Sequence, residues 1–175
     1  SITVADLNIC SATPFSFTPT DGTNGNIVPA NTTYAWTTPT VTGGITGGAA
    51  ASGQTNFGGT LTNPTNSQKT ATYTVTPTSP VGPCTGDNFT IVVNLNARPV
   101  IPNKSQTICS GTAFSITPTN GIGEIVPANT IYSWTVQDNS SISGESNGST
   151  NGNSIGQTLT NNSNSAQTVI YTVTP

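Results

Sequence analysis

The chain of 175 residues carries two closely related copies of one repeat in tandem. Three motifs of the first copy are Ile-Cys-Ser at 9–11, Ile-Val-Pro-Ala-Asn-Thr at 27–32 and Tyr-Ala-Trp-Thr at 34–37. They return as Ile-Cys-Ser at 108–110, Ile-Val-Pro-Ala-Asn-Thr at 125–130 and Tyr-Ser-Trp-Thr at 132–135. The offset is 99 residues at the cysteine (109 − 10) and 98 at the tryptophan (134 − 36). A repeat of this length is a whole domain, so we predict two modules, residues 1–99 and 100–175.

The second module is shorter than the first. After Pro77 the first module continues to a strong strand pattern at 88–96, whereas the chain stops at Pro175, the counterpart of Pro77. We therefore expect the second module to lack its last strand. The first residues have neither a basic start nor a long apolar stretch, which predicts a mature or internal segment.

The cysteines follow the repeat. We predict a structural disulfide between Cys10 and Cys84 of the first module, in keeping with an exported protein. Cys109 is the counterpart of Cys10, and its partner would fall beyond residue 175, so we expect an unpaired half-site. A metal site or redox pair is the alternative, but the chain has no histidine and no CxxC motif.

Apolar and polar residues alternate with period two in four segments of the first module: 15–18, 33–37, 70–76 and 89–95. This pattern is typical of half-buried antiparallel strands, and threonine on the outer face favours extended backbone. No segment shows the period of an amphipathic helix, and Asn, Gly and Pro mark turns between the strands. The fold class is therefore all-β, with immunoglobulin-like β-sandwich modules. The expected core aromatic residues are Tyr34, Trp36, Tyr73, Tyr132, Trp134 and Tyr171.

Charged residues make up only 5% of the chain, three basic and six acidic, against about 25% in an ordinary domain. Without histidine and with so few carboxylates, the chain lacks the groups of acid–base, metal or cofactor chemistry, so we expect neither catalytic residues nor a cofactor. Three dispersed cations cannot follow a phosphate backbone, which excludes nucleic acid as a partner. No apolar run is long enough to insert into a membrane.

Two motifs have a binding interpretation beside a structural one. The segment 21–26 places oxygen-bearing side chains on Asp21, Asn24 and Asn26, which makes it a weak calcium candidate, with a hairpin turn as the alternative. Trp36 with Tyr34, and Trp134 with Tyr132, could stack on sugars if their rings were exposed, but their strand spacing favours core packing. The glycine-rich segment 42–60 lacks the order of a phosphate-binding loop, and we interpret it as short bulged strands and loops.

These repeated residues resemble the PKD-like domains found in tandem in very large secreted surface proteins of Bacteroidota, including gliding and attachment adhesins. The resemblance rests on the Ile-Cys-Ser start, the run at 26–32, the Tyr-x-Trp motif and the Thr-Tyr-Thr-Val-Thr-Pro ending at 72–77. It implies an immunoglobulin-like sandwich, an extracellular location at the cell surface, and a spacer or adhesive role.

The leading hypothesis is a non-catalytic repeat in a long cell-surface adhesin stalk or filament. Pro99 and Pro102 stiffen the junction at 96–102, so we expect neighbouring modules to stand end to end. Its partners would be neighbouring modules or identical subunits, and surface glycans are a further candidate. The alternatives are a subunit of a polymeric fibre joined by β-strand addition, and a carbohydrate- or ice-binding module.

Overall fold

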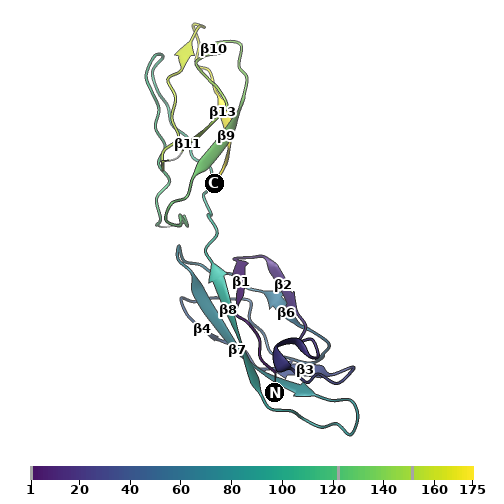
Figure 1. The fold of residues 1–175 in the computed structure, drawn as a ribbon. Coiled ribbons are helices and arrows are strands. Elements are labelled where there is room, and N and C mark those ends of the chain that lie inside the picture. Colours follow the sequence, from purple (N-terminus) through teal and green to yellow (C-terminus); the bar gives the residue numbers. More distant parts are fainter. Residues whose placement is uncertain (1, 122, 151) are drawn as a thin grey trace. The chain divides into compact units, whose positions relative to one another are not determined.

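The computed structural model describes residues 2–121, 123–150 and 152–175, which form two compact units, Ser1–Arg98 and Pro99–Pro175 (Figure 1). The first unit contains β1 (Leu7–Cys10), β2 (Pro14–Phe17), the 3-10 turn η1 (Thr23–Gly25), β3 (Thr33–Trp36), β4 (Thr40–Val41), β5 (Ala51–Gln54), β6 (Phe57–Thr60), β7 (Lys69–Thr78) and β8 (Phe89–Asn96). The second contains β9 (Tyr132–Gln137), β10 (Ile142–Ser143), β11 (Gly148–Thr150), β12 (Thr160–Asn161) and β13 (Ile170–Thr174).

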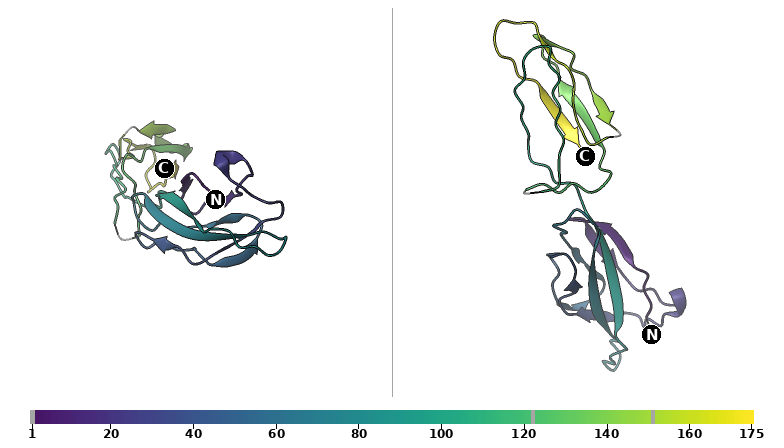
Figure 2. Two further views of the ribbon diagram at one scale, coloured as in Figure 1. Left: turned by 60° about the horizontal axis from the view of Figure 1, so that its bottom comes forward. Right: turned by 90° about the vertical axis from the view of Figure 1, so that its left-hand side faces the viewer.

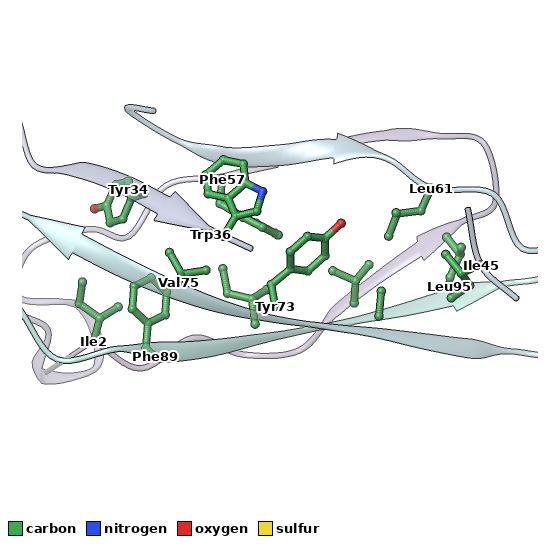
Figure 3. Close-up of a cluster of buried hydrophobic side chains, with 13 residues drawn as sticks. Ile2, Tyr34, Trp36, Ile45, Phe57, Leu61, Tyr73, Val75, Phe89 and Leu95 are labelled. Carbon is green, nitrogen blue, oxygen red and sulfur yellow. The ribbon is translucent and has the colours of Figure 1, made fainter. Parts of the chain in front are cut away.

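The first unit is a sandwich of two sheets. The larger sheet has the order β1-β8-β7-β3-β5, with β4 also paired to β7, and β2 pairs with β6 in the second. The long hairpin of β7 and β8 runs through the unit in each view (Figures 1 and 2). The core lies between the sheets, where Phe57 of β6 faces Trp36 and Tyr73 of the larger sheet (Figure 3).

Residues of β8 with period-two spacing supply one side of this core. Phe89, Ile91, Val93 and Leu95 are all at most 7% exposed, and the residues between them point away. Ala71, Tyr73 and Val75 of β7 are equally buried, with threonines on the opposite face. The alternation seen in the sequence therefore forms a sheet with one apolar face, which confirms the all-β prediction.

One strand pair departs from the predicted antiparallel pattern. β1 pairs in parallel with β8, with Leu7 opposite Val93 and Cys10 opposite Asn96. A parallel pair needs a long crossover connection, and here that connection is the rest of the module. The four-residue strand has only two half-buried apolar residues, Leu7 and Ile9, so its sequence does not show which strand it joins.

The second unit repeats part of this plan. β9 lies between β11 and β13, and β10 pairs with β12. Single bridges between Ala113 and Thr158 and between Ile116 and Ile155 stand in place of the β2–β6 pair. Its core is smaller and consists of Phe114, Tyr132, Trp134 and Ile155.

Two adjacent glycines of β6 meet different surroundings. A Cβ at Gly58 would lie 2.6 Å from the backbone oxygen of Phe15, whereas one at Gly59 would meet only the edge of the Phe15 ring at 3.8 Å. Gly156 of the second unit has the same close approach, to the backbone oxygen of Phe114. A glycine at this position lets the two strands pack closely.

We therefore expect Gly58→Ala to lower the free energy of unfolding by about 2 kcal/mol, because the backbone of β2 has to move. Gly59→Ala is the matched control and should change it by less than about 0.5 kcal/mol. Urea denaturation measures both variants. Equal effects would mean that the contact with Phe15 does not set the spacing of β2 and β6.

Helices are almost absent from the described residues, where η1 is a single 3-10 turn. None of the helical structure there has the length and hydropathy needed to cross a membrane.

Candidate functional site

The structure contradicts the predicted disulfide within the first module. Cys10 lies opposite Asn96, at the end of β8. Cys84 lies in the turn before β8, where its carbonyl accepts a hydrogen bond from the nitrogen of Ser79 at 2.9 Å. The two cysteines lie near opposite ends of β8, and its eight residues span about 25 Å at the usual rise of a β-strand. A disulfide requires Cα atoms about 4.4–6.8 Å apart, so this pairing is wrong.

All three cysteines are free and exposed: Cys10, Cys84 and Cys109. The repeat showed that Cys10 and Cys84 belong to the same module. The repeat did not show that the two cysteines lie at opposite ends of the module, because their positions depend on the parallel pairing of β1 with β8.

The calcium candidate loop is held together by its own polar side chains. Oδ1 of Asp21 accepts a hydrogen bond from the nitrogen of Val28 at 2.8 Å, and Oδ1 of Asn26 accepts one from the nitrogen of Thr3 at 2.7 Å. Asn24 contributes a positive φ of 56°. Within the part of the chain that the structure describes, no three His, Cys, Asp or Glu side chains gather as metal ligands. Calcium binding by Asp21, Asn24 and Asn26 stays a prediction.

The second unit repeats one of these loop contacts. Oδ1 of Asn120 accepts a hydrogen bond from the nitrogen of Val126 at 3.4 Å, at the position that Asp21 occupies in the first unit. A neutral amide thus makes the same kind of bond as the carboxylate. The shared role of this position is to close the loop.

The two tryptophans are packed in the cores. Nε1 of Trp36 donates to the carbonyl oxygen of Ala49 at 3.0 Å, and Nε1 of Trp134 donates to that of Ser146 at 3.0 Å. Their exposed fractions are 8% and 9%. The ring of Trp36 also meets Phe57 edge to face at 5.0 Å. Neither indole ring offers a free face for stacking on a sugar.

The most distinctive surface of the second unit is the outer edge of β13. β7 pairs with β3 on one side and with β8 on the other, whereas β13 pairs with β9 and, among the described residues, with no strand on its other side. Tyr171 and Val173 of β13 are only half-buried, although their counterparts Tyr73 and Val75 are 3% and 0% exposed. An apolar row therefore borders an open line of backbone hydrogen-bonding groups.

A buried asparagine next to β8 in the first unit was missed in the sequence. Asn63 is 1% exposed, and its Nδ2 donates to the carbonyl oxygens of Ser67 at 2.8 Å and Leu95 at 3.0 Å. Its counterpart Asn161 repeats the first bond, to Ser165 at 2.8 Å. The second bond goes to β8 in the first unit and has no counterpart in the described residues of the second.

The recurrence of Leu-Thr-Asn in both repeats was the available signal for this asparagine. Asparagine is common in turns, so the sequence alone did not show whether its side chain closes a turn or is buried against another strand. In both units the hydroxyl of the serine in the Ile-Cys-Ser motif accepts a hydrogen bond from the backbone nitrogen of this asparagine. The distance is 2.9 Å from Asn63 to Ser11 and 2.9 Å from Asn161 to Ser110.

The segment that precedes Ser110 also differs from its counterpart. Residues 106–109 correspond to β1, yet they form no strand, although Ile108 still packs against the core. β1 exists in the first unit because β8 is its partner. The outer edge of β13 thus has a half-buried apolar row, and Asn161 and the segment 106–109 lack the contacts that their counterparts make with β8.

Two of the few charged residues, Lys104 and Glu124, form an ion pair within the second unit. Lys104 contacts Glu124, whose other carboxylate oxygen accepts a hydrogen bond from the nitrogen of Thr119 at 3.2 Å. The hydrogen bond from Lys104 is the main reason that the pKa of the Glu124 carboxyl lies below its usual value. Lys104 therefore serves the second unit internally.

Fold and surface together define a tandem protein of immunoglobulin-like β-sandwich modules. The model of the PKD-like domain matches residues 7–99 and again residues 106–175, so the chain belongs to the PKD-like domain family. No curated protein and no solved structure shows significant similarity to the chain. PKD-like domains are generally non-catalytic structural modules and are typically found in extracellular proteins.

Proposed function

We propose that the chain forms part of a long extracellular stalk or filament that presents adhesive parts at a cell surface. The observation that carries the proposal is the tandem repetition of one sandwich module, each copy with its own core. The cores use apolar strand faces, and Thr, Asn and Ser supply the polar surface in place of charge. Nine charged residues over two modules produce little repulsion between neighbouring copies.

Small-angle X-ray scattering of tandem arrays of two, four and six copies of the chain tests this function. A stalk requires the radius of gyration to rise in proportion to copy number, because each module adds its own length. A compact assembly would instead follow roughly the 0.38 power of chain length, and that result would overturn the proposal.

The junction supplies a matched variant for the same measurement. Pro99→Gly combined with Pro102→Gly removes two residues that stiffen the linker and leaves both modules unchanged. We expect the six-copy array of this variant to be shorter on average than the parent. An unchanged radius of gyration would show that the prolines do not stiffen the array.

The open edge of β13 favours a second candidate function, a fibre subunit joined by β-strand addition. A strand with the pattern of β8 would pair with β13, bury Tyr171 and Val173, and supply a carbonyl oxygen to Asn161. Lateral main-chain hydrogen bonds would give affinity, and the alternating apolar side chains would give register.

A synthetic peptide with the sequence of residues 87–96, added to the whole chain, tests acceptance of such a strand. Hydrogen exchange of residues 170–174 should slow on binding, because their outward backbone groups gain partners. β7 already pairs with β8, so residues 71–75 of the same molecule serve as the internal control.

The control peptide carries Ile91→Asn and Val93→Asn, which keep its length and charge but remove two inward side chains. It should leave the exchange of β13 unchanged. Equal protection by both peptides, or by neither, would contradict a specific strand site. The mass of the native polypeptide separates the sources of the strand: a mass well above 17.7 kDa favours a continuing chain, and a match favours a second copy.

A further inference from the structure

The chain contains several asparagines that are followed by glycine, a pair of residues that is prone to spontaneous loss of ammonia from the asparagine side chain. The backbone nitrogen after the asparagine can attack the side-chain amide carbon, and glycine has no Cβ to hinder the approach. Such pairs occur at 24–25, 120–121, 147–148 and 151–152. Asn151 lies outside the described residues, so the structure distinguishes the other three asparagines.

Asn147 is held in place by the sheet of the second unit. Its Oδ1 accepts a hydrogen bond from the nitrogen of Val136 at 2.9 Å, and Gly148 begins β11, where it pairs with Trp134. The indole of Trp134 also packs against Gly148, since a Cβ added there would lie 2.6 Å from the ring. Attack on the side chain of Asn147 would therefore require β11 to separate from β9.

Asn120 lies in a turn that is closed around its glycine. The nitrogen of Gly121 donates to the carbonyl oxygen of Glu124 at 3.2 Å, and the nitrogen of Glu124 donates to the carbonyl oxygen of Gly121 at 3.2 Å. Oδ1 of Asn120 accepts a hydrogen bond from the nitrogen of Val126 at 3.4 Å. Glu124 is itself held by its ion pair with Lys104. The two groups that would react at Asn120, the nitrogen of Gly121 and the side-chain amide, thus already have partners.

Asn24 is exposed and lacks such restraints. It lies in the middle of η1 with a left-handed backbone, φ 56° and ψ 26°, and within the part of the chain that the structure describes its side chain makes no hydrogen bond. A Cβ added at Gly25 would meet no atom within 4 Å beyond its chain neighbours, so the reacting groups have room to turn toward each other. Hydrogen bonds from the nitrogen of Gly22 to Asn26 at 2.9 Å and from the nitrogen of Asn26 to Thr23 at 3.0 Å close the loop. Local opening of this exposed turn is enough for the reaction.

We propose that Asn24 is a site of self-modification, at which the folded chain converts this asparagine to aspartate or isoaspartate much faster than Asn120 or Asn147. The nitrogen of Gly25 attacks Cγ of Asn24 and forms a new C–N bond. The bond from Cγ to Nδ2 breaks, and ammonia leaves with the proton of the Gly25 nitrogen. Solvent water then opens the resulting succinimide ring at either of its carbonyl carbons. No electrons are transferred, and water is the only co-reactant.

The isoaspartate product changes the loop more than the aspartate product does. Opening of the ring at the backbone carbonyl leaves the main chain running through the former side chain, with an additional methylene carbon between residues 24 and 25. The hydrogen bonds that close the loop span this point, so we expect them to weaken.

The same loop anchors the N-terminal segment of the first unit. Asn26 is only 4% exposed, and its side chain exchanges hydrogen bonds with the backbone of Thr3 at 2.7 and 3.3 Å. The neighbouring Ile2 is 8% exposed in the core. Formation of isoaspartate at residue 24 therefore loosens the attachment of residues 2–4 to the first unit.

The test is incubation of the whole chain in mildly alkaline buffer, followed by peptide mapping with mass spectrometry that separates aspartate from isoaspartate. We expect conversion at Asn24 to exceed that at Asn120 and Asn147 by at least about tenfold, because only Asn24 reacts through the opening of a single exposed turn. The same chain unfolded in urea is the control, and there the three sites should convert at similar rates because each is followed by glycine.

Two results would overturn self-modification at Asn24. One is equal, slower or absent conversion of Asn24 in the folded chain. The other is a preference for Asn24 that persists in urea, since neighbouring residues rather than the fold would then select the site. Neither measurement involves the length of the arrays, so the outcome is independent of the scattering test of the stalk.

Asn24→Gly is the matched variant for the effect on the N-terminal segment. Glycine tolerates the left-handed backbone and has no side-chain amide, so the loop keeps its shape and cannot react. Hydrogen exchange at the nitrogen of Thr3 should accelerate in the incubated parent in proportion to its isoaspartate content and stay constant in incubated Asn24→Gly. Asn24→Asp adds the charge without the additional carbon and should exchange like the fresh parent. Unchanged exchange at Thr3 in the isoaspartate form would overturn the loosening of residues 2–4.

Discussion

Replacing Phe57 by alanine is expected to lower the free energy of unfolding of the first unit by about 3–5 kcal/mol. Phe57 is 1% exposed and is the residue through which β6 closes the core. Its ring centroid lies 4.7 Å from that of Tyr73 and 5.0 Å from that of Trp36, both nearly edge to face. Alanine would remove these contacts and leave a cavity that the strands on either side cannot fill without breaking their pairing.

Phe15→Ala is the matched control for this cavity. Phe15 lies on the neighbouring strand β2 and also contacts Phe57, with ring centroids 5.6 Å apart, but it is half-buried. We expect its loss to cost roughly half as much, because water already reaches one side of the ring. Denaturant unfolding in a Trp134→Phe background would follow Trp36 alone. Equal losses for the two variants would contradict a core centred on Phe57.

Asn63→Ala is expected to lower the free energy of unfolding by about 3 kcal/mol. The side chain is fully buried and connects the turn after β6 to the end of β8. Its Oδ1 also accepts hydrogen bonds from the nitrogen and the hydroxyl of Thr65, at 2.9 and 2.8 Å. Alanine would leave the carbonyl oxygens of Ser67 and Leu95 without this donor, and a buried unpaired acceptor is costly.

The same denaturation experiment includes two comparison variants. Asn66→Ala changes an exposed residue of the same turn and should be nearly neutral. Asn161→Ala, followed through Trp134 in the second unit, should cost less than Asn63→Ala because Asn161 is half-buried and its bond to a β8-like strand is missing. A larger loss at Asn161 would contradict this account of the open edge.

The fold class could be predicted because it depends on neighbours in sequence. Inward positions such as Ile91 and Val93 follow from a period of two residues, and burial follows from that period once a second sheet covers the face. The aromatic pairs behave in the same way: Tyr34 and Trp36 are 2% and 8% exposed. Their spacing alone indicates a shared face.

The cysteines and Asn63 could not be assigned in this way. The distance between Cys10 and Cys84 depends on the direction in which β1 joins β8, a pairing between residues more than 80 positions apart. Nothing within four residues of Leu7 encodes that direction. The same limit applies to Asn63, whose environment depends on Leu95 in a strand far along the chain.

The sequence by itself determined that the protein is a repeat of all-β modules with inward apolar rows, because both properties are periodic and periods are local. The tertiary structure alone decided which residues meet. It paired β1 in parallel with β8, separated Cys10 from Cys84 by the length of β8, and buried Asn63 against that strand. Those outcomes depend on strand order and direction, and the same alternation of apolar and polar residues is compatible with several strand orders and directions.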